Sequence, residues 1–96
     1  MRRVVVTGIG ATTPLAGNAT ESWKSLLEGK SGISTLEQEW VARHELPVTF
    51  AAQAKVLASE VLTPQEARRL DPSSQFALIS AREAWADAGE PEVEPE

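Results

Sequence analysis

The sequence predicts an α/β fold that forms the leading part of a larger layered protein. Three successive valines, Val4–Val6, form an apolar run without polar alternation, which is typical of a strand covered on both faces. Segments with helix start and stop signals follow this run. Residues 48–52 are the one other plausible strand, and a two-stranded sheet is marginal on its own. We therefore expect further chain, or partner chains, to complete the sheet.

The first expected strand, at 3–8, runs into a turn that contains two glycines, Gly8–Gly10. This turn begins like the dinucleotide fingerprint G-x-G-x-x-G, but Thr13 stands where the third glycine belongs. Pro14 keeps Thr13 extended, so the next helix begins near residue 19, too late to meet a pyrophosphate. We expect the glycines to serve a tight turn and close backbone packing, with nucleotide binding as the weaker alternative.

A helix is predicted at 19–28. Asn18 is a suitable N-cap, Glu21 stands in capping-box position, and Gly29 fits a C-terminal stop. Trp23 shares a stripe with two leucines, which predicts a core anchor rather than a ligand-stacking residue.

Residues 30–47 are a mixed stretch in which Trp40-Val41 fits a short helical turn. The only histidine, His44, lies there without a Cys or Ser partner at motif spacing, so we expect a surface residue. Val48–Ala52 is the second, weaker strand candidate.

Two further helices are predicted near the end of the sequence. Thr63–Glu66 combines an N-cap, a proline and a capping glutamate, which predicts a short helix at 64–70. Asp71-Pro72 repeats the start signal for a helix at about 72–88, which Gly89 ends. Small residues dominate its apolar face and imply close packing against a neighbour. That face comprises Ala77, Ala81, Ala84, Trp85 and Ala88.

No catalytic, cofactor-binding or metal-binding residue is expected in residues 1–96. The absence of cysteine excludes a disulfide framework, a Cys-based zinc site and a Cys nucleophile within them. Gly29–Ser31 resembles the end of a Walker A loop, but Lys24 stands where that motif needs glycine, and the segment follows a helix.

The net charge of −5 arises mostly from the tail, Glu90–Glu96, whose pattern predicts a solvated loop or linker. Without a basic stripe, no nucleic-acid partner is expected, and no apolar run is long enough for a membrane span. A cytoplasmic protein is the default expectation. Positive charge is concentrated at Arg68-Arg69, with Lys55 expected nearby. Charge alone favours a solvated helix end there.

Taken together, these segments resemble the amino-terminal end of the β-ketoacyl-acyl carrier protein synthases, nearest to type II elongating ketosynthases of actinobacterial type. The resemblance covers nearly the whole chain, with a looser fit over 34–62. The matching blocks are RRVVVTGIG at Arg2–Gly10, Thr13-Pro14-Leu15, WKSLLEGKSGI at Trp23–Ile33, EARRLDPSSQFAL at Glu66–Leu78, Glu83-Ala84 and Asp87-Ala88-Gly89.

This resemblance implies the amino-terminal part of a thiolase-like five-layered αβαβα fold, in which residues 1–96 belong to the first of two similar halves. It implies a homodimer that condenses an acyl thioester with malonyl-acyl carrier protein during fatty acid elongation, with loss of CO₂. The family's catalytic cysteine and two histidines lie beyond residue 96, and His44 matches neither histidine, so this segment alone is expected to be inactive.

One site is implied by the resemblance. A basic helix that matches Gln65–Arg69 helps to dock the acidic acyl carrier protein in the family, and Arg68 and Arg69 occupy its basic positions. Gln65 departs from the lysine of close relatives, and Pro72-Ser73 departs from the usual basic-aromatic pair. Both departures imply weaker or differently shaped docking.

Three alternatives remain open on the sequence. Within the same lineage, the chain fits a polyketide ketosynthase or its catalytically silent chain-length-factor subunit. Outside that lineage, it fits a small α/β interaction module that binds an acidic partner, or a nucleotide-binding domain. Downstream residues separate the active synthase from the silent partner, because the active enzyme needs the nucleophilic cysteine and glutamine in its place favours the silent partner.

Overall fold

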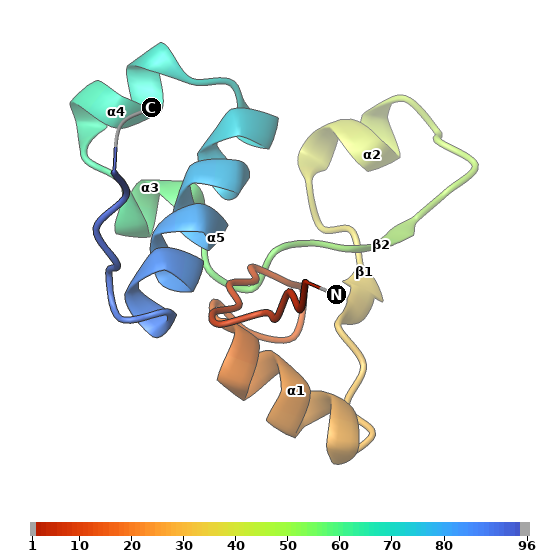
Figure 1. The fold of residues 1–96 in the computed structure, drawn as a ribbon. Helices are drawn as coiled ribbons and strands as arrows, with labels where there is room; N and C mark the ends of the chain where they lie inside the picture. The colour runs from red at the N-terminus through yellow and green to blue at the C-terminus, as the bar shows by residue number, and fades with distance from the viewer. Residues whose placement is uncertain (1, 95–96) are drawn as a thin grey trace.

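The computed structural model describes residues 2–94, which form one long helix, four shorter helices and one two-stranded sheet (Figure 1). In chain order the elements are α1 (Ala19–Leu27), β1 (Ile33–Thr35), α2 (Glu39–Arg43), β2 (Phe50–Ala52), α3 (Ala58–Val61), α4 (Pro64–Arg69) and α5 (Pro72–Asp87). Over this described range, none of the helices combines the length and apolar character needed to cross a bilayer.

The predicted helices at 19–28, 64–70 and 72–88 are confirmed to within about one residue at each end. Their starts are fixed by side-chain caps. Asn18 Oδ1 accepts the Glu21 N–H at 2.8 Å at the start of α1. At the start of α5, Asp71 Oδ1 accepts the Ser74 N–H at 2.8 Å. Helix α2 confirms the expected helical turn around Trp40.

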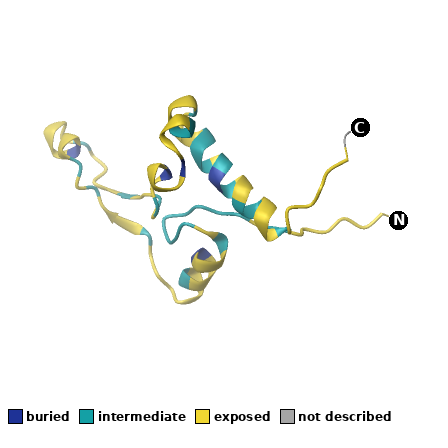
Figure 2. Cartoon of the chain, turned by 90° about the vertical axis from the view of Figure 1, so that its left-hand side faces the viewer, coloured by how far each residue is buried: buried dark blue, intermediate teal, exposed yellow. Residues whose placement is uncertain are grey.

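The sheet is a hairpin with α2 at its tip. Strands β1 and β2 are antiparallel, with Ile33 opposite Ala52 and Thr35 opposite Phe50. The predicted strand at 48–52 is confirmed over its last three residues, whereas β1 was not predicted. The hairpin stands apart from the helices α3, α4 and α5 in both ribbon views (Figures 1 and 2).

The core is small and lies between α3 and α5. Ala58, Leu62 and Ile79 are buried together, with Phe76 and Leu78 packed against them. Figure 2 shows how few buried residues the ribbon contains, and none of the described side chains is completely enclosed. This cluster positions α5 and the short helices that precede it.

The predicted strand at 3–8 does not form in this structure. Val4 is 93% exposed, Val5 62% and Val6 80%, so the expectation of a covered strand is wrong for this chain by itself. A strand requires a neighbour that accepts and donates its backbone hydrogen bonds. Among residues 2–94, β1 and β2 pair only with each other and leave the valine segment without such a neighbour.

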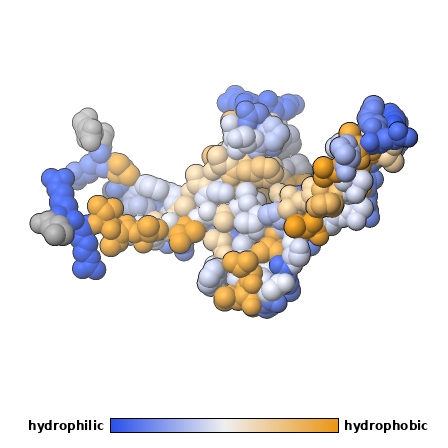
Figure 3. Space-filling view, turned by 90° about the vertical axis from the view of Figure 1, so that its right-hand side faces the viewer, coloured by the Kyte–Doolittle hydropathy of each residue, from blue (hydrophilic) through white to orange (hydrophobic). Residues whose placement is uncertain are grey.

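Other predicted core residues also lie at the surface. Trp23 is 60% exposed, which corrects its assignment as a core anchor, and Trp85, Ala77 and Ala81 on α5 are exposed as well. Figure 3 shows hydrophobic surface along the extended amino-terminal segment and over the middle of the molecule. The described chain leaves these apolar side chains uncovered.

The molecule is more open than a self-contained domain of its length. The radius of gyration of the Cα atoms is 17.1 Å, and the molecule extends over 56 × 36 × 25 Å. A compact domain of this length has a radius of gyration of about 12.5 Å. The open shape and the exposed apolar faces have the same physical origin, which is a core too small to draw the elements together.

Candidate functional site

The glycine turn is occupied by the protein's own carboxylates. The Ile9 N–H donates to Asp87 Oδ2 at 3.0 Å, and the Ala11 N–H donates to Glu83 Oε1 at 2.9 Å. A phosphate-binding turn needs free backbone N–H groups and a positive local field. Here those two N–H groups are already paired, and two carboxylates stand where an anion would sit. The turn therefore does not fit nucleotide binding.

The glycines allow the backbone of the turn to lie directly against α5. A Cβ atom on Gly8 would lie 2.7 Å from the Ala88 nitrogen, and one on Gly10 would lie 2.8 Å from the Ala84 nitrogen. No real Cβ sits that close to backbone, so only glycine fits at these positions. This confirms the predicted role in close packing, and it confirms Ala84 and Ala88 as the small residues that meet a neighbour.

Glu83 also joins the turn to α1. Its second carboxylate oxygen, Oε2, accepts the Ala19 N–H at 2.9 Å at the first residue of that helix. A carboxylate is favoured there because the first N–H groups of a helix lack internal partners. Glu83 and Asp87 lie four residues apart on one face of α5, and that spacing opposite a glycine turn is the signal that sequence reasoning missed.

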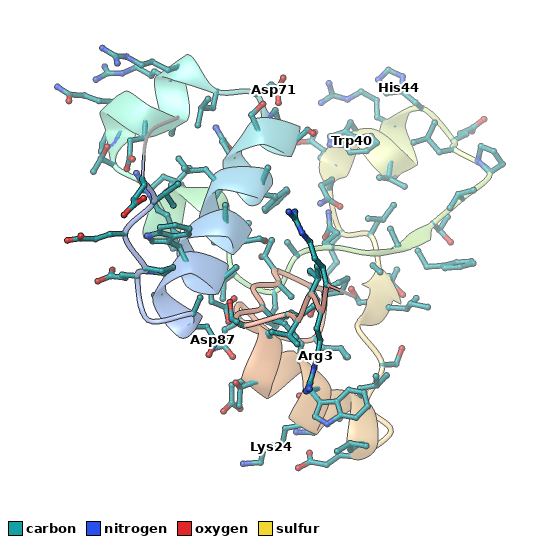
Figure 4. All side chains as sticks on the ribbon, viewed as in Figure 1. Arg3, Lys24, Trp40, His44, Asp71 and Asp87 are labelled. Carbon is teal, nitrogen blue, oxygen red and sulfur yellow. The ribbon has the colours of Figure 1, made fainter. Side chains whose placement is uncertain are left out.

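The hydroxyl pair Thr13 and Ser22 fastens the same loop to α1. Their oxygens lie 2.7 Å apart, and Thr13 Oγ1 also accepts the Leu15 N–H at 3.1 Å. Ser22 is buried. A serine nucleophile needs an adjacent base, and His44 lies on the hairpin, away from the Asp87 end of α5 (Figure 4). The pair is thus structural.

An open groove of about 760 Å³ runs along this loop, α1 and the start of the hairpin. Apolar side chains dominate its lining, including Ile9, Trp23 and Ile33. Glu83 and Asp87 also reach it, but their carboxylates already accept the N–H groups of the turn. The groove consequently offers apolar contact area rather than reactive groups.

Other candidate motifs carry no chemistry in the described residues. Lys30 of the Gly-Lys-Ser segment follows α1 and forms an exposed ion pair with Glu28, with a distance of 3.0 Å from Nζ to Oε2. His44 lies exposed at the end of α2 (Figure 4). Over residues 2–94, no group of three or more His, Cys, Asp or Glu residues could hold a metal ion.

The basic end of α4 is the remaining candidate. Arg68 and Arg69 occupy the last turn of this helix, are exposed, and make no ion pair within the described part of the chain. Their positive charge lies at the carboxyl end of the helix, where cations are favoured. They are therefore available to an acidic partner.

Glu66 fixes the start of the same helix. Its Oε1 accepts the Thr63 N–H at 3.1 Å, while Thr63 Oγ1 accepts the Glu66 N–H at 3.2 Å, which confirms the predicted capping box. Its Oε2 pairs with Arg82 on α5. The Arg82 hydrogen bond and the Thr63 N–H lower the pKa of Glu66 from 4.5 to about 2, and the same pair raises the pKa of Arg82.

The two departures from the family pattern lie on different helices, Gln65 on α4 and Pro72-Ser73 at the start of α5. Gln65 is exposed on α4 and adds no charge. Pro72 and Ser73 form the first turn of α5, where Asp71 caps the helix, and hydrogen bonds from Ser74 lower the pKa of Asp71. The positive charge of the described site is thus concentrated on Arg68 and Arg69.

Comparison with known proteins places the chain in a family. The family model described as "Beta-ketoacyl synthase, N-terminal domain" matches residues 1–95. A Mycobacterium bovis protein named 3-oxoacyl-[acyl-carrier-protein] synthase 2 is 40% identical over 91 residues, which cover 95% of this chain and 22% of that protein. Relatives of the same name from Mycobacterium leprae and Coxiella burnetii are each 37% identical, over 95% and 92% of this chain and 22% and 21% of their own lengths.

The chain thus spans about a fifth of the length of the curated relatives it matches. The match nevertheless covers the valine segment, the glycine turn and all the helices described above. On that extent of agreement, the chain belongs to the β-ketoacyl synthase N-terminal domain family.

Proposed function

We propose that this chain is the amino-terminal segment of an elongating β-ketoacyl-acyl carrier protein synthase, in the first half of a thiolase-like five-layered fold. The family match over residues 1–95, with relatives named 3-oxoacyl-[acyl-carrier-protein] synthase 2, carries this proposal. In the reaction, an enzyme cysteine holds the acyl group as a thioester. Malonyl-acyl carrier protein loses CO₂, and the resulting carbanion attacks the thioester, which yields 3-oxoacyl-carrier protein and frees the cysteine.

The segment contributes framework and partner recognition rather than the reacting groups. The cysteine and both histidines come from the remaining four-fifths of the protein, as does the cover for the valine segment and the apolar groove. The exposure of Val4–Val6 supports this division, because three adjacent valines in water leave apolar area that folding normally removes. A cytoplasmic homodimer is part of the same proposal.

Arg68 and Arg69 serve as the docking point for the acidic carrier protein. Two adjacent guanidinium groups that are exposed and make no ion pair with residues 2–94 attract a negatively charged surface and steer its approach. Arg82 does not contribute in this way, because Glu66 already neutralises it.

Steady-state kinetics of the full-length protein test the docking assignment. We expect Arg68→Glu to raise the KM for malonyl-carrier protein about tenfold, with little change in kcat, because the variant weakens encounter rather than chemistry. The effect should shrink as salt rises, since exposed charges are screened over about 10 Å at 0.1 M ionic strength.

Arg43→Glu is the matched control. It makes the same change of charge on the hairpin, where Arg43 pairs with Glu39, with 2.7 Å between Nη2 and Oε1. It should leave the KM for malonyl-carrier protein near the wild-type value. An unchanged KM in Arg68→Glu at low ionic strength, or an equal rise in both variants, contradicts the docking role. A full-length protein that forms no 3-oxoacyl product from acyl and malonyl thioesters contradicts the enzymatic proposal itself.

A further inference from the structure

Helix α4 is too short to hold a fixed direction by its own hydrogen bonds. It contains six residues, and isolated helices of that length are unstable in water. Its arginines can therefore present a defined docking surface only if other parts of the chain fix both ends. The structure shows one such contact at each end, and both contacts are made by side chains of α5.

At the amino-terminal end, the contact is the ion pair between Glu66 and Arg82 of α5. One carboxylate oxygen closes the capping box with Thr63, and the other pairs with Arg82 of α5. This contact locates the start of α4, but it is exposed and lies before the two arginines.

At the carboxyl-terminal end, the contact is made by the side-chain amide of Gln75 in α5. The Gln75 side-chain nitrogen Nε2 donates to the Ala67 carbonyl oxygen at 2.9 Å and to the Leu70 carbonyl oxygen at 3.0 Å. Ala67 and Leu70 immediately flank Arg68 and Arg69 in the chain. Carbonyl groups at a helix end have no partner inside the helix, so both can accept these bonds. The backbone on either side of the arginine pair is thus bound to one side chain.

Gln75 is itself well anchored. It is half-buried in the first part of α5, and its neighbour Phe76 packs against the core of Ala58, Leu62 and Ile79. A donor held by the core transmits the position of α5 to the end of α4. A solvent-exposed donor would lose most of this effect to its own side-chain freedom.

We propose that Gln75 is a positioning residue for carrier-protein docking, which holds the backbone around Arg68 and Arg69 so that both guanidinium groups face the partner together. This inference rests on the proposed docking function and adds a residue that carries no charge. Without Gln75, the arginines remain exposed, but each binding event must first order the end of α4.

The test uses full-length Gln75→Met, which keeps the length of the side chain and removes the donor. We expect the KM for malonyl-carrier protein to rise about fivefold with kcat unchanged, the size expected for losing a hydrogen bond of ordinary strength. Turnover with malonyl-coenzyme A, which lacks the protein surface, should be unaffected. Gln53→Met is the matched control, because Gln53 is exposed after β2 and its side chain makes no hydrogen bond in the described chain.

A combined variant, in which Gln75→Met is added to the two arginine substitutions, separates positioning from general stability. If Gln75 acts through the arginines, Gln75→Met should add little to the KM once Arg68→Glu and Arg69→Glu are present. An additive rise, or an equal loss of activity with malonyl-coenzyme A, contradicts the inference. A normal KM in Gln75→Met alongside a raised KM in Arg68→Glu overturns the role of Gln75 and leaves the docking site standing. A normal KM in Arg68→Glu removes the docking function on which the inference rests.

Discussion

At the scale of single residues, the glycine turn shows how one motif can support two opposite readings. Glycines after an apolar run are shared by phosphate-binding turns and by turns that pack against a helix. Thr13 and Pro14 favoured the second reading from the sequence. The structure adds the decisive detail, because Glu83 and Asp87 occupy the N–H groups that a phosphate would need.

Gly10→Ala should destabilise the full-length protein by about 3 kcal/mol, because the added methyl group meets the backbone of Ser80 and Ala84. Thermal or urea unfolding measures this change. Gly29→Ala is the control: Gly29 has a φ of 74°, but its Cβ position is open, so only backbone strain of about 1 kcal/mol arises. Equal losses in the two variants would show that close approach to α5 is unimportant.

Glu83 should matter through its oxygens rather than its charge. Glu83→Leu leaves the N–H groups of Ala11 and Ala19 without their acceptor and should lower the free energy of unfolding by about 3 kcal/mol. Glu83→Gln retains one oxygen and should lose about half as much. Urea unfolding of both variants checks the order, and a Gln variant as unstable as the Leu variant would contradict it.

At the scale of elements, the sequence predicted what short-range chemistry decides. The starts of α1, α4 and α5 are set by caps within three residues, so the pattern alone located them. The elements it missed, β1 and α3, have no such signal. Helix α3 begins after Leu57, which makes no side-chain cap, and β1 spans three residues whose pairing with β2 depends on tertiary context.

The link between α4 and α5 should be acid-sensitive. The pKa of Glu66 is about 2 in the folded chain against 4.5 ordinarily, so its charge adds stability that is complete above pH 4.5. That contribution is lost as the pH falls from 4.5 towards 2, because protonated Glu66 no longer attracts Arg82. The difference in urea midpoint between wild-type full-length protein and Glu66→Gln should shrink over that range. A difference that stays constant down to pH 2.5 would contradict the assigned pKa.

At the scale of the whole molecule, the sequence predicted an unfinished sheet, and the structure shows its consequence. The valine pattern predicted an apolar strand, which does not form, because a strand needs neighbours that residues 2–94 do not supply. Trp23 was misplaced for the same reason, because its face of α1 opens onto the groove instead of a core. Local pattern therefore predicted the capped helices, whereas strand pairing and burial depend on how much protein surrounds the segments.

Hydrogen exchange at the Val4–Val6 amides, read by mass spectrometry, tests this most directly. It should be measured in the 96-residue chain and in a full-length protein of the relatives' size. We predict fast exchange in the 96-residue chain and strong protection in the full-length protein, where neighbouring strands accept those hydrogen bonds. Protection of the valine amides already in the 96-residue chain, or fast exchange in both proteins, would contradict the assignment of this segment to a larger sheet.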